Sequence, residues 1–273
     1  MKIELQRVAP AEIEARSMEI IRSELKRPLP PENEAVILRA IHTTADFDYA
    51  ENLCFSPEAV ARGVEALRSG AHIVTDTTMA MSGINKRVLA KFGGEVHNFI
   101  ADPEVAAQAK ERGVTRATIS MERAAAMGKS LVYAIGNAPT ALVRLYELWQ
   151  EGTLPAPALI VGVPVGFVNV VEAKELIMEM DCPWIVARGR KGGSNVAAAR
   201  SMLTVARVTP RSLAWAATSG SAMKLWTSPP NLARTRLLMP DMAMVVSVTM
   251  WVPLRRASTP RATASGEKQR FSA

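Results

Sequence analysis

Short apolar runs and longer amphipathic segments alternate along most of this chain. Between residues 56 and 203, runs apolar at every position are each followed by a segment with helical spacing. Strands buried on both faces belong to parallel sheets, so the rhythm predicts an α/β fold. We expect a parallel sheet flanked by helices, in a Rossmann-like three-layer arrangement, with strands at residues 72–75, 131–135, 158–161 and 184–187.

The residues before Ser56 have a different pattern, which predicts an N-terminal helical segment. Helical spacing of apolar residues extends over residues 11–25, ends at a group of prolines, and resumes over residues 34–45. Further along the chain, Ser56, Asp76 and Asn137 each precede a helical pattern and are predicted to cap helix N-termini with their side chains.

The rhythm fails after about residue 203, and the charge changes at the same place. Residues 201–273 contain ten Lys and Arg but only two acids, a net charge of +8, whereas residues 1–200 carry −1. We therefore expect a folded domain over residues 1–205 and a basic, poorly ordered tail over residues 206–273 that is dispensable for ligand binding. The overall charge of +7 arises in the tail, so it does not indicate a nucleic-acid partner for the domain.

Several functional classes are disfavoured by composition. The two cysteines, Cys54 and Cys182, lack metal-type or redox-type spacing and are interpreted as reduced thiols of a cytoplasmic protein. The N-terminus has no apolar signal core, and no apolar run approaches the roughly 20 residues that span a bilayer. No metal site is predicted, and His72 and His97 are interpreted as structural residues of strands.

Polar and glycine-rich segments follow the predicted strands, where ligands of such sheets bind. They begin at Asp76, Gly136, Val163 and Arg188, with a further cation at Arg116. Taken singly, each is better explained as a turn, a helix cap or a solvated loop. Together they bring several cations and backbone amides to one sheet edge, which favours a large ligand with several negative charges. None matches a dinucleotide or phosphate-loop fingerprint.

A histidine adds acid–base chemistry to this picture. The run from Arg39 to Asp48 places His42 three residues after an arginine, and before two threonines and two aspartates. A histidine gains or loses a proton near neutral pH, and Arg39 would share its helical face.

These segments, taken together, resemble the precorrin-8X methylmutases, also called precorrin isomerases. The similarity covers about residues 8–200 and is most specific in Gly-Asn-Ala-Pro-Thr-Ala-Leu at residues 136–142 and Gly-Val-Pro-Val-Gly-Phe-Val at residues 162–168. It implies an isomerase of cobalamin biosynthesis that moves a methyl group from C-11 to C-12 of precorrin-8X to give hydrogenobyrinate, with no cofactor. It also implies a homodimer with the site near the subunit interface, and hand-over to neighbouring pathway enzymes.

The resemblance assigns roles to particular residues. His42 falls on the family histidine and would act as general acid, protonating the macrocycle so that the methyl shift becomes favourable and the product is trapped. Ser17 and Arg39 fall at substrate-contacting positions. With the loop residues above, the predicted substrate-binding set is Ser17, Arg39, Thr43, Thr77, Lys86, Arg116, Asn137, Thr140, Gly166, Arg190, Lys191 and Ser194.

Other interpretations stay open at this point. The substrate could carry cobalt, as in the cobalt-precorrin-8 methylmutases of the anaerobic pathway. The chain could be a tetrapyrrole carrier without turnover, or an enzyme of similar fold for a nucleotide-sugar or a phosphoester. The tail departs from the family pattern, and its composition fits either a natural extension or a reading-frame change in a GC-rich gene.

Overall fold

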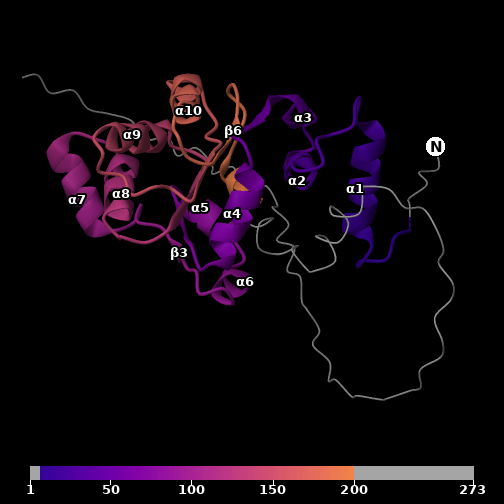
Figure 1. Ribbon diagram of the computed structural model, residues 1–273, viewed down its shortest axis with the longest axis horizontal. Helices are drawn as coiled ribbons and strands as arrows, with labels where there is room; N and C mark the ends of the chain where they lie inside the picture. The colour runs from indigo at the N-terminus through magenta and orange to yellow at the C-terminus, as the bar shows by residue number, and fades with distance from the viewer. Residues whose placement is uncertain (1–6, 200–273) are drawn as a thin grey trace, which may run out of the picture. The chain divides into compact units, whose positions relative to one another are not determined.

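A computed structural model describes residues 7–199 of the chain (Figure 1). The chain divides into two compact units, residues 1–221 and 222–273, and all the described residues belong to the first. The predicted tail over residues 206–273, and the boundary at residue 205, lie outside the described residues.

The core of the described unit is one six-stranded sheet in the order β1-β6-β5-β4-β2-β3. The strands β2 to β6 are parallel to one another, and β1 pairs antiparallel with β6. The four predicted strands are confirmed, as is a strand at His97. The strands are β1 Leu53–Phe55, β2 His72–Thr75, β3 Val96–His97, β4 Leu131–Ile135, β5 Leu159–Gly162 and β6 Trp184–Ala187.

Helices follow the strands as the hydrophobic rhythm predicts, and the two helices expected before residue 56 are present. Residues 194–199 are also helical. The helices are α1 Ile13–Glu24, α2 Glu34–Thr44, α3 Tyr49–Asn52, α4 Ala59–Arg68, α5 Thr78–Gly83, α6 Lys86–Ala90, α7 Pro103–Arg112, α8 Arg116–Ala125, α9 Pro139–Gln150 and α10 Val170–Met178.

Alternate side chains of the sheet enter two separate hydrophobic clusters. In β4, Val132 and Ala134 join the cluster that contains α1, α2 and α4, whereas Tyr133 and Ile135 join the one with α8, α9 and α10. Every residue of β4 is buried because both faces are covered. The prediction of an α/β fold with a sheet flanked by helices is therefore confirmed.

Two predictions near α4 are wrong. Residues 53–55 form β1, a strand that was not predicted, and its antiparallel pairing with β6 makes the sheet mixed where a parallel sheet was expected. Ser56 does not cap α4, because its hydroxyl accepts a hydrogen bond from the Trp184 backbone amide at 2.9 Å. The turn into α4 instead passes through Glu58, whose φ is +55°.

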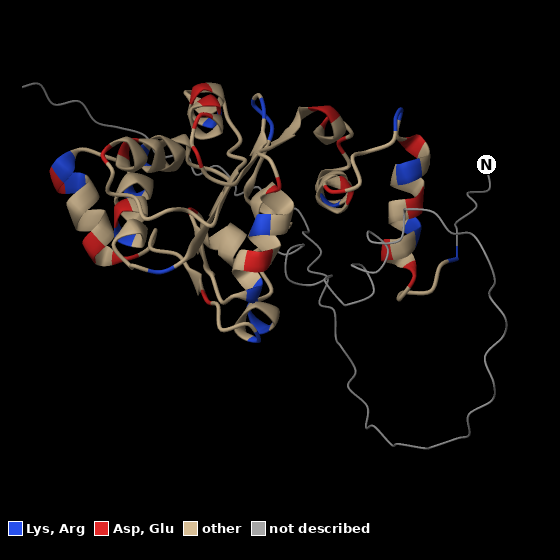
Figure 2. Ribbon diagram, in the orientation of Figure 1, with Lys and Arg blue, Asp and Glu red and all other residues tan. Residues whose placement is uncertain are grey.

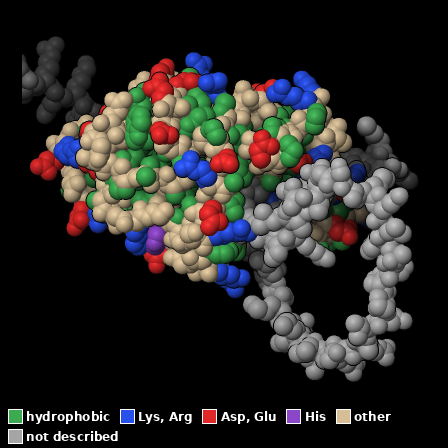
Figure 3. Space-filling model, in the orientation of Figure 1, with side chains coloured by type: hydrophobic (Ala, Val, Ile, Leu, Met, Phe, Trp, Pro, Cys, Tyr) green, Lys and Arg blue, Asp and Glu red, His purple; other side chains and the backbone are tan. Residues whose placement is uncertain are grey.

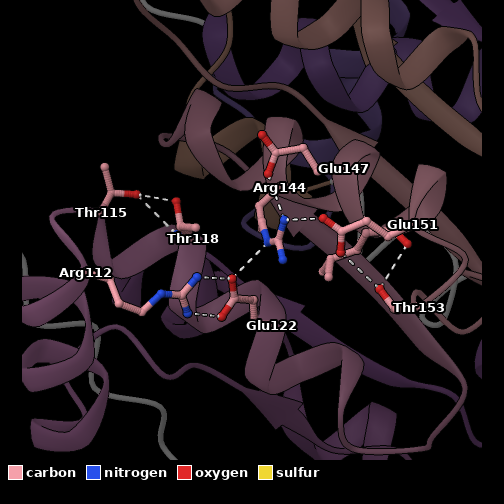
Figure 4. Close-up of polar contacts among 9 residues, drawn as sticks. Arg112, Thr115, Thr118, Glu122, Arg144, Glu147, Glu151 and Thr153 are labelled. Atoms are coloured by element: carbon pink, nitrogen blue, oxygen red, sulfur yellow. Dashed lines mark hydrogen bonds and ion pairs between the residues drawn. The ribbon is translucent and has the colours of Figure 1, made fainter.

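Charged side chains of both signs are interspersed over the described helices, as the near-neutral charge of residues 1–200 requires (Figure 2). Hydrophobic side chains reach the surface between them (Figure 3). On α8 and α9, Arg144 contacts Glu122, Glu147 and Glu151, and Glu122 also binds Arg112 (Figure 4). This network ties α7, α8 and α9 together, and so fixes the positions of their ends.

Candidate active site

The candidate site lies where the strand order reverses, between β2 and β4. At such a switch point the loops after neighbouring strands diverge, which leaves a crevice at the carboxyl ends of the strands. The loops that begin at Asp76, Gly136, Val163 and Arg188 all follow strands whose carboxyl ends meet at this edge. The parallel sheet thus gathers the segments that the sequence singled out.

Asp76 is the buried centre of this edge. Its Oδ1 accepts a hydrogen bond from the Gly136 amide at 3.0 Å, and its Oδ2 accepts from the Asn137 and Ala138 amides, both at 2.7 Å. Burial raises the pKa of the Asp76 carboxyl, while these three amide donors oppose the rise. The amides before α9 are therefore occupied by a carboxylate of the protein itself.

Three capping and ligand predictions change as a result. Asp76 does not cap α5, because Thr77 does so by accepting from the Ala80 amide at 3.1 Å. Asn137 does not cap α9, whose N-cap is Ala138 without a side-chain hydrogen bond. The amides of residues 136–138 do not face an external anion, because Asp76 already binds them.

The loops touch one another through their backbones. A Cβ added to Gly136 would lie 2.7 Å from the Ser194 Cα, and one added to Gly192 would lie 2.0 Å from the Val163 carbonyl oxygen. The Thr77 and Ser194 hydroxyls are hydrogen-bonded at 2.8 Å. Thr77 and Ser194, both predicted site residues, are thus brought together from positions 117 apart in the sequence.

A buried lysine of α10 holds the loop after β6 in place. Lys174 of α10 is fully buried, and its Nζ donates to the Gly189 carbonyl at 2.7 Å and the Lys191 carbonyl at 2.9 Å. Lys174 was not among the predicted site residues. The stretch Val170–Met178 is apolar except for Lys174 and two glutamates, and a single cation in such a stretch is the signal that could have indicated it.

Removing this anchor should loosen the loop. In a Lys174→Met variant the loop loses two charge-assisted hydrogen bonds, each contributing about 1.5–3 kcal/mol, so we expect trypsin to cleave after residues 188–191 at least about tenfold faster. Mass spectrometry of timed native digests measures this rate. A Lys110→Met variant, altered on the exposed face of α7, should be cut there at the wild-type rate, and equal rates for both variants would contradict the anchoring role.

Lys191, a predicted substrate-binding cation, is engaged by the protein. Its Nζ contacts Asp48 Oδ2 at 2.6 Å and Asp46 Oδ2 at 2.7 Å, and these carboxylates raise its pKa. The two aspartates follow α2, so Lys191 ties the loop after β6 to the end of the helix that carries His42. His42 itself is exposed in the last turn of α2, and Thr43 beside it is half-buried.

Arg39 and Ser17 belong to the paired helices α1 and α2. The Arg39 guanidinium forms an ion pair with Glu14 of α1, and its side chain retains 22% exposure. Ser17 donates its hydroxyl to the Ile13 carbonyl at 2.8 Å within α1. The ion pair with Glu14 thus joins Arg39 to the helix that bears Ser17.

Arg190 is the most available cation of the four loops. It is exposed, and its guanidinium carbon lies 5.4 Å from the centre of the Phe167 ring. Phe167 is 81% exposed and Val168 78%, in the loop after β5. Gly166 joins the two loops by donating its amide to the Arg190 carbonyl at 3.2 Å. The exposed apolar side chains were not predicted as contacts, although they lie inside the family motif.

The remaining predicted residues occupy neighbouring helix starts. The Thr140 hydroxyl of α9 is hydrogen-bonded to that of Thr115 at 2.7 Å, which places Arg116, the first residue of α8, beside the start of α9. Thr115 and the ion pairs behind it are shown in Figure 4. Lys86 is exposed at the start of α6, and Asn137 is exposed after β4.

Comparison with known proteins gives the family. The family model for precorrin-8X methylmutase matches residues 12–202. The chain belongs to the precorrin-8X methylmutase family. It is accordingly an isomerase of cobalamin biosynthesis, as the resemblance implies. No described helix has the length and apolar character needed to cross a membrane.

The matches with members of this family span most of the length of each relative. The chain is 47% identical to the cobalt-precorrin-8 methylmutase of Salmonella typhimurium, over 70% of this chain and 91% of the relative. It is 39% identical to the precorrin-8X methylmutase of Pseudomonas aeruginosa, over 63% and 82%. The crystal structure of precorrin-8X methylmutase from Thermus thermophilus superposes with a TM-score of 0.65 at 40% identity, covering 71% of this chain and 96% of that one.

Proposed function

We propose that this enzyme moves the methyl group of its corrin precursor from C-11 to C-12, with His42 as the general acid and the four loops as the macrocycle-binding surface. The observation that carries the proposal is that the loops held by Asp76 converge at one sheet edge with exposed Arg190 and Phe167. Lys191 joins this edge to the end of α2, the helix that carries His42. A Rossmann-like three-layer arrangement would account for this convergence.

The surface suits a flat ring with acidic side chains. Phe167 and Val168 offer apolar contact to the face of a macrocycle, while Arg190 and Arg116 offer cations to its carboxylates. Arg39, which forms an ion pair with Glu14 in this structure, is expected to bind a ring carboxylate of the substrate. Thr43, Thr77, Thr140 and Ser194 supply hydroxyl donors, and Asn137 an amide.

His42 would supply the proton that drives the rearrangement. His42 donates a proton to the macrocycle, the bond from the methyl carbon to C-11 breaks as the bond to C-12 forms, and the product then returns the proton to His42, which restores the starting state. Atoms balance because substrate and product are isomers. The side chain of His42 faces solvent, so it is accessible to a ligand.

Arg190 provides a test of carboxylate binding with a control in the same loop. An Arg–carboxylate hydrogen bond contributes about 1.5–3 kcal/mol, so Arg190→Ala should weaken macrocycle binding at least about tenfold. Arg188 lies two residues away but forms an exposed ion pair with Glu175 at 3.0 Å, so Arg188→Ala should change affinity less than about threefold. Titration of the visible absorbance measures both, and equal losses would remove Arg190 from the site.

The choice between metal-free and cobalt-bearing substrate has support on each side. The relatives at 47% and 42% identity are cobalt-precorrin-8 methylmutases, from Salmonella typhimurium and Priestia megaterium, whereas the Pseudomonas aeruginosa relative at 39% is a precorrin-8X methylmutase. Turnover of the two substrates compared at equal concentrations would assign the pathway. A carrier without catalysis would bind one of them and convert neither.

We also propose that the enzyme is a homodimer, in which the exposed apolar side chains of the loop after β5 face the ligand and the partner subunit. Val165, Phe167 and Val168 expose about half or more of their surface, which is unusual for a monomer unless they are covered in the working assembly. Light scattering coupled to gel filtration gives the mass directly. Release of product to the next enzyme of the pathway would then start from this interface.

A further inference from the structure

A second cluster of reactive side chains lies at the edge of the sheet, on the paired strands β2 and β3. His72 Nδ1 and His97 Nε2 are 3.0 Å apart, and Glu95 Oε2 is 3.8 Å from the same His97 nitrogen. One ligand atom from each of the three side chains lies within 4.8 Å of the others. Spacing along the chain did not reveal this cluster, since His72 and His97 are brought together only by strand pairing.

The sheet edge holds these side chains rigidly. His72 begins β2 and His97 ends β3, and the two strands are parallel with Val74 opposite His97. Alternation along the strands puts Glu95 and His97 on one face of β3, which is the face of His72 and Val74 on β2. The His97 ring stacks on Phe99, with centroids 6.2 Å apart and planes 11° from parallel. Both imidazoles are therefore positioned before any ligand arrives.

Electrostatics around the pair favour neutral rings and admit a cation. Burial lowers the pKa of both His72 and His97, so each presents the neutral imidazole that metals bind. Glu95 is 69% exposed and supplies the negative charge. Lys129 acts on both histidines from nearby and opposes a cation. The 3.0 Å contact between the two nitrogens is a hydrogen bond in which either ring can be the donor, depending on its tautomer.

We propose that His72 Nδ1, His97 Nε2 and the Glu95 carboxylate bind a divalent transition-metal cation of the Zn²⁺ class. Imidazole and carboxylate are ligands that Zn²⁺ accepts, at about 2.0–2.2 Å, and three protein ligands leave a fourth position for water. Nitrogens 3.0 Å apart can share one such ion at an N–Zn–N angle of about 95°, and a small ring rotation opens this toward tetrahedral.

The site would clip the edge of the sheet and would take no part in the methyl shift. β3 is two residues long and pairs only with β2 within the described sheet, so few backbone hydrogen bonds hold it. The ion would add a link between the side chains of the two strands. An ion that binds only the folded chain adds stability by mass action. Zinc should therefore raise the melting temperature of the full-length protein.

Titration of metal-free protein with zinc chloride, followed by calorimetry, tests the proposal. We expect one site per chain, lost in His97→Gln and weakened by more than about tenfold in Glu95→Gln, because removing a ligand costs at least as much as removing an outer-shell partner. Lys129→Gln should tighten binding. His42→Ala removes the third histidine of the chain and should leave zinc affinity unchanged.

Cobalt(II) chloride serves as a spectroscopic probe of the same site. Wild type should give the visible absorption bands of a four-coordinate Co²⁺ with nitrogen and oxygen ligands, and Glu95→Gln, an exposed substitution that does not threaten folding, should alter them. The absence of a zinc site in wild type, or zinc affinity unchanged in both His97→Gln and Glu95→Gln, would overturn the proposal. Circular dichroism of each variant establishes that it is folded before titration.

Discussion

Replacing His42 with alanine is expected to slow methyl migration by roughly 100- to 10,000-fold, the contribution of a positioned general acid, while macrocycle affinity stays within about tenfold. The reason is chemical, because alanine cannot protonate the ring but leaves the loops and their cations in place. Single-turnover absorbance of the bound pigment separates the rate from the affinity. His42→Gln, which keeps a hydrogen-bonding side chain but cannot act as an acid near neutral pH, should be equally slow.

The control for this experiment is Glu32→Gln, an exposed change just before the same helix, which should turn over at the wild-type rate. A near wild-type rate in His42→Ala would withdraw the general-acid role while leaving the family assignment intact. Wild-type protein that binds pigment without converting either substrate would instead support a carrier. The two failures are therefore distinguishable.

Replacing Asp76 with alanine should cost at least about 3 kcal/mol in the free energy of unfolding. Three backbone amides would lose their acceptor, and each buried donor left unpaired costs about 1–3 kcal/mol. Asp76→Asn should cost less, because its amide oxygen still accepts at the Oδ2 position, but its NH₂ group would face the Gly136 N–H. Urea unfolding followed by circular dichroism gives both values.

Asp181→Asn, an exposed substitution, should change the free energy of unfolding by less than about 0.5 kcal/mol. If Asp76→Ala matched this control, water would have to replace the carboxylate at all three amides. The central position of Asp76 in the candidate site would then be unsupported.

The parallel strands could be predicted because each is a run of apolar residues bounded by turns, and the sheet requires nothing else of them. β1 could not, because Leu53–Phe55 is three residues long and becomes a strand only by pairing with β6, about 130 residues away. Ser56 was misread for the same reason, since its partner Trp184 lies on that distant strand.

The candidate site was predicted loop by loop, but the pairing of its charges was not. The ion pairs of Arg39 and Lys191 could not be predicted because their acidic partners are distant in sequence. Glu14 lies on another helix from Arg39, and Asp46 and Asp48 lie over 140 residues from Lys191. Asp76 had the opposite problem. Its position before a helix suggested a local cap, while its true partners lie about 60 residues along the chain, in the loop after β4.

The close backbone contacts at Gly136 and Gly192 set limits on redesign of this site. Any side chain at Gly192 would overlap the Val163 carbonyl, and one at Gly136 would overlap the backbone at Ser194. A substitution at either position would therefore push apart the loops that contact each other there. Phe167, Val168 and Arg190 project from the same loops into solvent, so a library aimed at new ring substituents should vary these three and keep both glycines.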